Sequence, residues 1–403
     1  MIKDFTHLSV ASGYSFKFGT ASPEKLVEQA AKLNLKSLAL TDRDNMAGAI
    51  RFAKACEAFD IKPILGINLG FIQKQERITL LAQSGKLSSL YRLITAINTN
   101  SSDGVLTKEI LEKFAHYAKD VIALFGPQSS LVKNLIARNE GAALSIYQLS
   151  SNYFAKVALE CVSHLERAGN LRSTAAAAKS LSFAIKHQIP AVLSNQVRLL
   201  TPQDGPVADL LDASRKLVLI SDASLDRSNG EGYLKSSEQM FLVADQIARA
   251  AGEVSSKGLL KVSEDIAQSC QLSARGEIGL GNIHLPEPAL FNAQNNGQLI
   301  TVLENKAADQ INYYYPPGMK DEVEARLAKE IWIVNQLGFA SYFLTVASIT
   351  DAAKQLGIRV AARGSAAGSL ICHLLGISEV EPISNGLLME RFCSIERNEL
   401  PDI

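Results

Sequence analysis

The stretch Ser22–Leu69 reads SPEKLVEQAAKLNLKSLALTDRDNMAGAIRFAKACEAFDIKPILGINL, and it decides the fold class. Its first helix has a good start, because a Ser side chain accepts from the free amides of a first turn and Pro suits the first helical position. Amphipathic segments at Pro23–Leu33 and Gly48–Phe59 alternate with apolar runs at Ser37–Thr41 and Pro63–Leu69. This order of helix and strand patterns predicts βα units and a parallel sheet.

The same alternation continues to about residue 215. Further strand candidates are Ile78–Ala82, Val121–Phe125, Lys156–Glu160 and Pro190–Ser194. About six or seven βα repeats predict an α/β fold whose sheet is either open or closed into a barrel. The pattern alone does not separate a barrel from a doubly wound open sheet.

The rest of the chain is rich in helical patterns and contains two polar breaks. The breaks are Asp222–Gly232 (DASLDRSNGEG) and Pro286–Gly297 (PEPALFNAQNNG), and we expect the second to be a linker. Apolar residues recur at helical spacing in Met240–Ala251, Ile266–Leu272, Asp321–Leu337 and Tyr342–Leu356. A length of 403 residues favours at least two domains.

Composition excludes several classes of protein. Forty-one Lys and Arg residues balance 41 Asp and Glu residues, which excludes a basic nucleic-acid-coating protein and an acidic tail protein. The five cysteines are widely spaced and form no CxxC pair, which argues against a zinc ribbon or a disulfide framework. The start lacks a signal peptide, and no uncharged apolar run approaches about 18 residues. These features predict a soluble, cytoplasmic protein without a membrane partner.

The strongest local signal for chemistry is Ile358–Leu374, IRVAARGSAAGSLICHL. Small residues let a phosphate approach the backbone, and free amides at the start of the helix that follows favour an anion. Arg363 adds a bidentate phosphate donor beside Gly364 and Ser365. The segment matches neither the GxxxxGK[ST] loop nor the GxGxxG fingerprint. Close helix packing through small residues is the alternative interpretation.

The final segment, Met389–Ile403, reads MERFCSIERNELPDI and adds two cations and a carboxylate. The cations are Arg391 and Arg397, and Asp402 lies in a short apolar stretch. A lone Asp near a terminus is usually a solvated turn residue, and this one gains interest only beside the Gly-Ser loop. A loop that holds a triphosphate, together with carboxylates that hold Mg²⁺, is what metal-assisted nucleotidyl transfer requires. We interpret the final Ile as a chain end within a strand.

Near the N-terminus, polar residues follow or end apolar runs, where the active sites of βα barrels collect. The two segments are His7–Ser12 and Thr41–Asp44. A metal ion there would need His and carboxylate ligands, for which His7 and Asp42 are the candidates. The histidines do not cluster in the sequence, so structural roles for these two residues are the favoured interpretation.

Taken together, these segments resemble the bacterial family C DNA polymerases, the polymerase III alpha subunits. HLSVASGYSFKFGTASPEKLVEQA, LALTDRDNMAGAIRFAKAC and KPILGINL are similar to the family's N-terminal polymerase-and-histidinol-phosphatase (PHP) domain. LGFASYFLTVASI, ARGSAAGSL and LLMERFCSIERNELPDI are similar to the start of its palm. The matches occur in the right order along the whole chain, and the second block is the more specific. The segment TDRDNMAGAIRFAKAC resembles the error-prone polymerases of the family more than the replicative ones.

The resemblance implies a fold and a division into domains. Residues 1–285 would form a PHP-type distorted (β/α)7 barrel with a helical extension, and residues 286–403 the truncated N-terminal part of a polymerase-beta-like nucleotidyltransferase palm. The implied activity is template-directed addition of deoxynucleotides to a primer 3′ end through two Mg²⁺ ions, in DNA replication, repair or translesion synthesis. The implied partners are primer-template DNA and dNTPs. A sliding clamp and other replisome or mutasome subunits would bind regions outside this chain.

The resemblance also assigns residues in the palm. Gly364 and Ser365, with Arg363 beside them, would bind the triphosphate of the incoming nucleotide. Asp402 corresponds to the first Asp of the family's PDxD pair, and would be a catalytic residue and a Mg²⁺ ligand. The second Asp would follow Ile403, so the metal site is incomplete and the 403 residues alone are expected not to extend primers.

Two arginines complete this assignment. Arg391 and Arg397 occupy the family's ERF and PER positions, which are expected to contact phosphate. Residues Val360, Ala361 and Ala362 depart from the family, since many relatives have more glycine before the loop.

The PHP half departs from its family at almost every ligand position. The positions concerned are Ser9, Ala11, Asp42, Arg43, Asn68, Gln196 and Arg198. Ser9 and Ala11 stand in place of an HxH pair, and only Asp42 is kept. One carboxylate does not hold a divalent metal, so we expect no cofactor in this half and no metal-dependent proofreading or phosphoesterase activity. We hypothesise that Arg43 and Arg198 neutralise the carboxylates that remain, as an ion-pair network.

Two other functions stay open at this stage. The chain could be a non-catalytic scaffold, a truncated relative that binds a polymerase or DNA. It could also be a PHP metal-dependent phosphoesterase, against which the missing ligands argue. The choice between replicative and error-prone type, the fidelity, clamp binding and oligomeric state are beyond what these residues establish.

Overall fold

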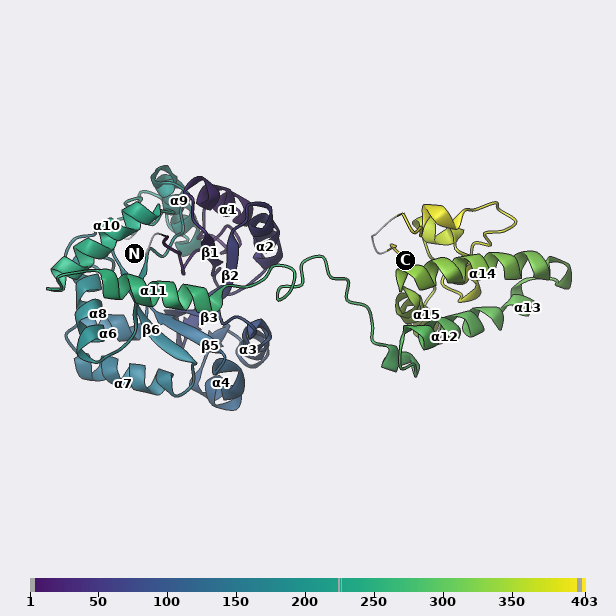
Figure 1. The fold of residues 1–403 in the computed structure, drawn as a ribbon, viewed down its shortest axis with the longest axis horizontal. Helices are drawn as coiled ribbons and strands as arrows, with labels where there is room; N and C mark the ends of the chain where they lie inside the picture. Colours follow the sequence, from purple (N-terminus) through teal and green to yellow (C-terminus); the bar gives the residue numbers. More distant parts are fainter. Residues whose placement is uncertain (1–3, 224, 226, 397–400) are drawn as a thin grey trace. The chain divides into compact units, whose positions relative to one another are not determined.

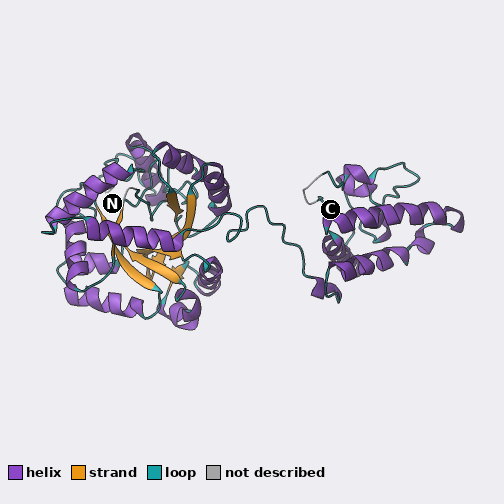
Figure 2. Ribbon diagram, in the orientation of Figure 1, coloured by secondary structure: helices purple, strands orange, loops and turns teal. Residues whose placement is uncertain are grey.

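The computed structural model describes residues 4–223, 225, 227–396 and 401–403, in which the chain forms two compact units. The first unit is Met1–Gly281 and the second is Asn282–Ile403. Each unit has its own buried apolar core. Among the described residues the strands all belong to the first unit, whereas helices occur in both (Figures 1 and 2).

The first unit is built on a curled seven-stranded sheet with helices around it (Figure 2). The strands are β1 (Ser37–Leu40), β2 (Lys62–Phe71), β3 (Gln73–Ala82), β4 (Val105–Leu106), β5 (Val121–Phe125), β6 (Lys156–Val162) and β7 (Ala191–Ser194). Their order in the sheet is β1-β2-β3-β5-β6-β7, and β4 pairs with β2. All six strand candidates predicted from the sequence are found, and the predicted α/β class is confirmed.

One strand runs against the predicted parallel direction. β3 is antiparallel to both β2 and β5, while β1, β2 and the run β5-β6-β7 are paired in parallel. β2 and β3 are joined only by Ile72, which takes a positive φ of 59°. No helix separates these two strands, so the expectation of a βα unit at this point is wrong. An apolar run predicts a strand but does not give its direction.

The N-terminal segment joins the two edges of the sheet. The amides of Ala39 and Thr41 donate to the carbonyls of His7 and Val10, at 3.0 and 2.8 Å. On the other side, the Ala11 amide donates to the Val197 carbonyl at 2.8 Å, and the Val197 amide donates to the Ser9 carbonyl at 2.9 Å. The segment therefore lies between β1 and the residues after β7, and the resulting closure agrees with the expected distorted barrel.

Helices of the first unit surround the sheet, most of them on its outer face. They are α1 (Pro23–Lys32), α2 (Ala49–Ala58), α3 (Leu87–Asn100), α4 (Lys108–Lys113), α5 (Ala115–Ala118), α6 (Ser130–Ile136), α7 (Glu140–Ser151), α8 (Thr174–Lys186), α9 (Gly205–Lys216), α10 (Ser237–Ala250) and α11 (Lys257–Cys270), with a 3₁₀ turn η1 (Pro202–Asp204). The predicted start of α1 is confirmed, since Ser22 accepts a bond from the amide of Lys25. The apolar faces of most of these helices pack into one core with the outer face of the sheet.

Helix α11 has a different position, because it packs on the inner face. Its residues Ile266, Ala267 and Cys270 form a separate apolar cluster. The sheet residues of that cluster are Leu8, Ala39, Ile64, Leu81, Ile122, Leu124, Ala158 and Val192. The backbone bond from Leu272 N to Pro63 O, 2.9 Å, fixes the end of the helix near the start of β2. Thus α11 closes the end of the sheet at which the parallel strands begin.

The second unit contains helices, turns and loops, and no strand among its described residues. Its helices are α12 (Asn296–Ala308), α13 (Ile311–Tyr314), α14 (Lys320–Leu337), α15 (Ala340–Gln355) and α16 (Leu370–Leu374), with 3₁₀ turns η2 (Pro288–Phe291), η3 (Pro317–Met319), η4 (Gly364–Gly368) and η5 (Met389–Arg391). Residues 401–403 are not in a strand, and 397–400 lie outside the described residues, so the structure shows no strand at the chain end.

The predicted linker at Pro286–Gly297 is wrong. These residues form η2 and the first turn of α12, whose start is capped by the Asn295 side chain accepting from the Gln298 amide. Phe291 and Ala293 pack in the core of the second unit. Pro and Asn are common at helix starts as well as in linkers, so composition alone does not separate the two.

Among the described residues, no single helix is long and apolar enough to cross a membrane. The segments Pro317–Leu337 and Ala340–Gln355 meet that test only together, as a pair bent by 113°. Both contribute buried apolar residues to the core of the second unit.

Candidate functional site

The inner face of the sheet changes from apolar to polar along the strands. Successive strand residues point to opposite faces, so Ile64 and Asn68 of β2 share a face, as do Ala158 and Glu160 of β6. Ile64 and Ala158 pack on α11, whereas the residues further along are polar. The apolar layer closes one end of the sheet, and a polar layer faces the other end, where the parallel strands terminate.

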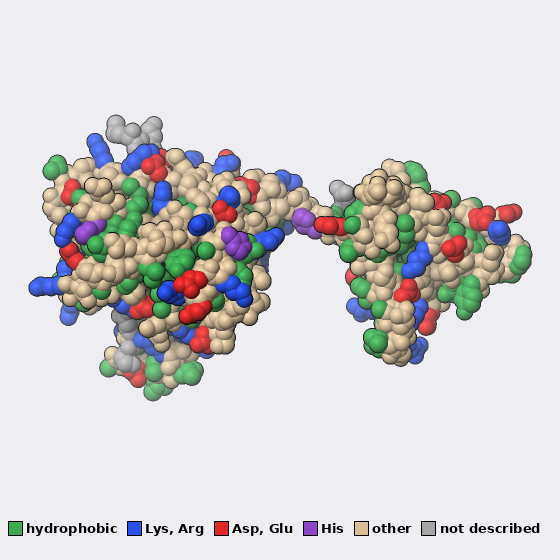
Figure 3. Space-filling view, turned by 90° about the horizontal axis from the view of Figure 1, so that it is seen from below, with side chains coloured by type: hydrophobic (Ala, Val, Ile, Leu, Met, Phe, Trp, Pro, Cys, Tyr) green, Lys and Arg blue, Asp and Glu red, His purple; other side chains and the backbone are tan. Residues whose placement is uncertain are grey.

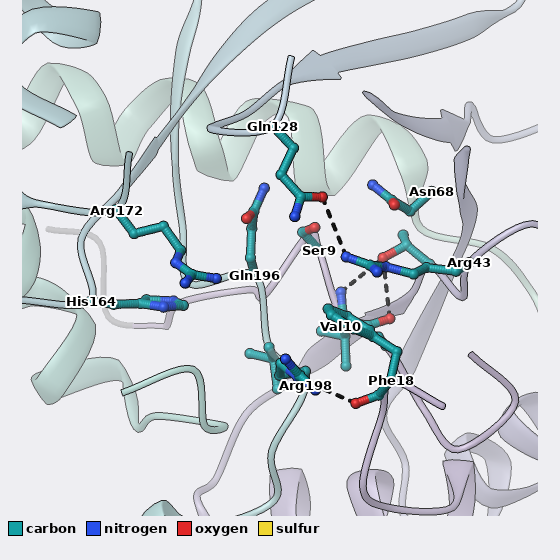
Figure 4. Close-up of a pocket in the computed structure, with 13 residues that line it drawn as sticks. Ser9, Val10, Phe18, Arg43, Asn68, Gln128, His164, Arg172, Gln196 and Arg198 are labelled. Carbon is teal, nitrogen blue, oxygen red and sulfur yellow. Dashed lines mark hydrogen bonds between the residues drawn. The ribbon is translucent and has the colours of Figure 1, made fainter. Parts of the chain in front are cut away.

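A cavity lies in this polar layer, and we call it the inner cavity (Figure 4). Its volume is about 40 Å³. Its lining residues are Ser9, Val10, Ala11, Phe18, Thr41, Arg43, Asn68, Gln128, His164, Arg172, Gln196, Val197 and Arg198. Six of the seven positions predicted for the former metal site therefore come together here. The seventh, Asp42, is not in the lining.

Asp42 is buried, and its carboxylate accepts hydrogen bonds from Ser12 and Ser15 instead of facing the cavity. One carboxylate oxygen accepts from the Ser12 amide at 2.6 Å and from Ser15 Oγ at 2.7 Å. The other accepts from Ser12 Oγ at 2.8 Å. Burial raises the pKa of Asp42, and these bonds from Ser15 and Ser12 oppose the rise only in part. The carboxylate fixes the loop after the first segment of the barrel.

The hypothesis of an ion-pair network with the remaining site carboxylates is wrong for both arginines. Arg198 is buried and forms a two-pronged pair with Asp212 of α9, at 2.8 and 3.2 Å. Arg43 has no carboxylate within ion-pair distance in the part of the chain that the structure describes; its guanidinium donates to Gln128 Oε1 at 3.3 Å. Both guanidinium groups lie against the Phe18 ring, with their carbons 3.2 Å (Arg43) and 4.1 Å (Arg198) from its centre.

Histidines near the cavity are neutral. His164 Nε2 pairs with the Asn195 carbonyl at 2.8 Å, and burial, helped by the charge of Arg172, lowers the His164 pKa to about 3. His7 Nε2 pairs with the Lys235 carbonyl at 2.9 Å, and burial lowers its pKa to about 4. Across the described residues, no group of three or more His, Cys, Asp or Glu side chains is placed to hold a metal ion.

Glu160 lies behind the cavity and is fully buried. Its Oε2 accepts from Gln196 Nε2 at 3.1 Å, while Oε1 has no hydrogen-bond partner among the described residues. Burial raises the pKa of this carboxyl, and Gln196, Ser194 and Ser9 only partly oppose the rise. A Cβ at Gly126 would lie 2.3 Å from Glu160 Oε2 and 2.5 Å from Gln196 Nε2, so a larger residue here would have to displace these two side chains.

The second candidate site is the Gly-Ser loop of the second unit. Arg363, Gly364 and Ser365 are exposed at the start of η4, and Gly364 takes a positive φ of 77°, which favours glycine. η4 packs against η5, the turn that carries Arg391. Gly368 approaches the Leu388 carbonyl so closely that a Cβ would lie 2.8 Å from it. The loop and the segment before Arg391 are therefore held together.

The expectation that free amides at the start of α16 bind an anion is wrong, because Glu330 of α14 already occupies them. Its carboxylate is fully buried and accepts from the amides of Leu370 and Ile371 at 3.0 and 3.1 Å. Ser369 Oγ donates to it at 3.0 Å, and Arg326 Nε at 2.7 Å. The exposed part of the loop lies one turn earlier, at Gly364 and Ser365.

Arg326 also connects the loop to the following segment. Its Nη2 donates to the carbonyl of Gly368 at 3.1 Å and to that of Leu387 at 3.2 Å. Arg391 and Asp402 are exposed, and Arg397 lies outside the described residues. The structure therefore brings the Arg363–Ser365 turn together with the turn that carries Arg391.

Comparisons with known proteins match both units. A PHP domain model matches residues 7–164, and the model described as the bacterial DNA polymerase III alpha NTPase domain matches residues 301–403. An error-prone DNA polymerase of Symbiobacterium thermophilum is 30% identical, with 99% of this chain and 36% of that protein covered. A DNA polymerase III subunit alpha of Buchnera aphidicola is 27% identical, with 100% and 34% covered. For an error-prone DNA polymerase 2 of Rhizobium meliloti the identity is 25%, with 99% and 34% covered.

The chain belongs to the bacterial DNA polymerase III alpha family. It aligns with the N-terminal part of these polymerases and spans about a third of the length of the curated relatives it matches. The predicted order, a PHP domain followed by the start of the polymerase III alpha region, is confirmed.

Sequence reasoning missed several residues of the two candidate sites. Phe18, Gln128 and Arg172 stand alone in the sequence, and only the closure of the sheet brings them together. Glu160 did carry a signal, since a carboxylate in the apolar run KVALECV is unusual for a buried strand. Arg326 and Glu330 are separated by one helical turn, which is the spacing of an ion pair on α14.

Proposed function

We propose that this chain is the N-terminal part of a DNA-directed DNA polymerase, with dNTPs and primer-template DNA as the substrates of the whole protein and the cytoplasm as its location. The observation that supports this most is the geometry of the Gly-Ser loop. Its exposed turn at Arg363, Gly364 and Ser365 rests on the buried Glu330, which fixes the loop without using its exposed residues. Such a turn offers a cation and approachable backbone to a triphosphate.

Arg391 fits the same role, because η5 packs against η4. Arg391 is exposed and makes an interaction within the chain. We propose that Arg363 and Arg391 together neutralise phosphate charge of the incoming nucleotide, with Arg397 as a third cation whose position lies outside the described residues.

Mg²⁺ is the cation that two-metal nucleotidyl transfer needs, and it takes several oxygen ligands. Asp402 is an exposed carboxylate, and no group of three metal-ligating side chains is found among the described residues. The described residues alone therefore do not fit such a site. We propose Asp402 as one Mg²⁺ ligand and catalytic residue of the whole polymerase, and we expect no primer extension by the 403 residues alone.

We propose further that the PHP half has no metal-dependent proofreading or phosphoesterase activity. The inner cavity is lined by hydroxyl, amide and guanidinium groups and by one neutral histidine. Divalent metals prefer carboxylates and neutral imidazoles in groups, and that lining does not supply them. A sliding clamp and further replisome or mutasome subunits remain proposed partners of the whole protein.

The test of the loop is equilibrium binding of dATP to the 403-residue chain. Arg363→Gln should weaken binding by about tenfold, the effect of losing one charge-assisted hydrogen bond. Lys320→Gln, at an exposed position at the start of α14, is the matched control and should bind like the wild type. Equal loss in both variants would mean that binding depends on overall charge, and would contradict a nucleotide site at the loop.

The test of the polymerase is primer extension by the native product of the gene that encodes this chain. Asp402→Asn should reduce incorporation by roughly 100-fold or more, since the residue would act on charge that develops in the transition state. Asp351→Asn, a partly exposed carboxylate paired with Lys306, is the control. A native product that binds DNA but does not incorporate nucleotides would favour the scaffold alternative.

A further inference from the structure

A second cavity continues from the inner one, and we call it the outer cavity. Its volume is about 270 Å³, whereas one water needs only about 10–15 Å³ measured in this way. It is lined by Phe18, Arg43, Gln128, His164, Glu166, Arg172, Arg198, Asp212, Arg215, Lys216, Ser228, Asn229 and Gly232. Six of these residues also line the inner cavity, so the two form one continuous site.

Among the described residues of this lining, cations outnumber carboxylates. The cations are Arg43, Arg172, Arg198, Arg215 and Lys216, and the carboxylates are Glu166 and Asp212. Asp212 is shared between Arg198 and Arg215, and Glu166 pairs with Arg172 at 2.7 Å. The excess of positive charge is local, since the chain as a whole is neutral and its charges are interspersed over the face seen in Figure 3. A concave site with one sign of charge concentrates ions of the opposite sign.

Arg43 is the centre of this excess. It lies half-buried against Phe18, and it uses one of its five N–H donors for the side chain of Gln128. Burial lowers the pKa of Arg43 well below its ordinary value, and the neighbouring charges of Arg77, Arg215 and Arg198 lower it further. The cation is thus held at a cost that no carboxylate within ion-pair distance offsets in the described part of the chain. Binding of an anion at this site would explain why a cation without a carboxylate partner is placed there.

The remaining polar groups suit an anion as well. The amides of Gln128 and Gln196 and the hydroxyl of Ser9 are neutral donors that line the inner cavity. Arg43 and Arg172 extend toward the pocket from opposite sides, with Gln196 between them (Figure 4). The carboxyl of Glu160 lies behind Gln196, outside the lining of both cavities, and burial raises its pKa.

We propose that the continuous site formed by the inner and outer cavities binds phosphate, free or as a terminal phosphomonoester, through Arg43 and without a metal ion. Guanidinium groups match tetrahedral oxyanions because two N–H donors meet two oxygens. The neutral His164 and the amide side chains complete the polar surround. The site lies in the first unit, and its occupancy is independent of nucleotide binding at the Gly-Ser loop.

The experiment measures binding of inorganic phosphate to the 403-residue chain by calorimetry, at constant ionic strength and with EDTA present. Arg43→Gln should weaken binding by about tenfold or more, and Arg43→Lys, which keeps the charge but loses the fork, should fall between. Arg249→Gln, at an exposed position on α10, is the matched control and should bind like the wild type. Deoxyadenosine monophosphate is the second probe, and its binding tells a terminal phosphomonoester from free phosphate.

Folding of the variant is checked separately. Removing a desolvated cation should leave the melting temperature of Arg43→Gln in phosphate-free buffer equal to that of the wild type or higher. Phosphate should then raise the melting temperature of the wild type but not that of this variant. Equal phosphate affinity of wild type and Arg43→Gln overturns the proposal, and so does phosphate binding by the wild type that is found only when EDTA is left out.

Discussion

Among the described residues each unit buries one glutamate, and the two glutamates differ strongly in their hydrogen bonding. Glu330 of the second unit accepts from four donors, namely Arg326 Nε, Ser369 Oγ and the amides of Leu370 and Ile371. Glu160 of the first unit accepts from the side chain of Gln196, and its other oxygen has no hydrogen-bond partner among the described residues. Both side chains are almost completely excluded from solvent.

This difference separates a structural carboxylate from one in a binding site. A buried charge is retained without strain only when it is paired and fully hydrogen-bonded, as Glu330 is. Glu160 has a buried carboxyl and Arg43 a half-buried guanidinium, and neither has a partner of opposite charge at ion-pair distance in the described residues, which costs stability. Groups of this kind cluster at functional sites. The comparison therefore points to the first unit's cavity as a site with a ligand and to the Glu330 cluster as the support of a loop.

The largest effect should come from Glu330→Gln. Removing one partner of a buried, hydrogen-bonded pair leaves Arg326 uncompensated, and should cost about 3–5 kcal/mol in the unfolding of the second unit. The chain has one tryptophan, Trp332 on α14, so urea unfolding followed by its fluorescence reports on this unit.

Glu324→Gln is the control for this variant, since Glu324 is exposed on the same helix. It should change the free energy of unfolding by less than about 0.5 kcal/mol. A similar small change for Glu330→Gln would show that the cluster is not the support of the Gly-Ser loop.

Glu160→Gln should change the free energy of unfolding in the opposite direction. It should stabilise the first unit at neutral pH by about 1–3 kcal/mol. A carboxyl whose pKa is raised on folding destabilises the folded state when the solution pH lies above that pKa. As the pH falls toward and below the ordinary carboxyl pKa, about 4.3, the wild-type carboxyl becomes neutral in both states and the difference should shrink toward zero. Thermal unfolding followed by circular dichroism between pH 4 and pH 8 measures this, and a difference that grew toward low pH would contradict it.

The smallest effect should come from Lys329→Gln. Lys329 Nζ lies 2.5 Å from Glu390 Oε1 and joins α14 to η5, but both side chains are about half-exposed. An exposed pair of this kind contributes about 0.2–1 kcal/mol and is weakened by salt. Trp332 fluorescence should show a small loss that disappears at high salt. A loss as large as that of Glu330→Gln would mean that the exposed pair, and not the buried glutamate, holds η5.

Much of the first unit's fold was predictable because strand and helix periods are local. The strands at Val121–Phe125 and Lys156–Val162 contain short apolar runs between helical patterns, and those runs predicted them. The reversal of β3 was not predictable, since the turn at Ile72 carries none of the Gly or Asn signals that usually mark a hairpin. The closure by residues 7–11 depends on pairing with residues far along the chain, which no local pattern reports.

The candidate sites were predictable to different degrees. Positions such as Asn68 and Gln196 could be placed through the family resemblance, and the structure does bring them into one cavity. The partner of Arg198 could not be predicted, because Asp212 lies on a helix whose orientation depends on the packed fold. In the second unit the small residues of the loop were identified, but Glu330 was not, although its carboxylate determines which amides remain available.

The position of α11 has a consequence for how the first unit is made. All seven strands precede this helix in the sequence, and the PHP domain match ends well before it, at residue 164. During synthesis the inner apolar face of the sheet therefore stays open to water until residue 270 has left the ribosome. A fragment that ends at residue 164, where the PHP match ends, would lack β7 and α11. It should aggregate through the exposed leucines and isoleucines of the inner face. We therefore expect that the smallest piece that folds by itself extends at least through Leu272.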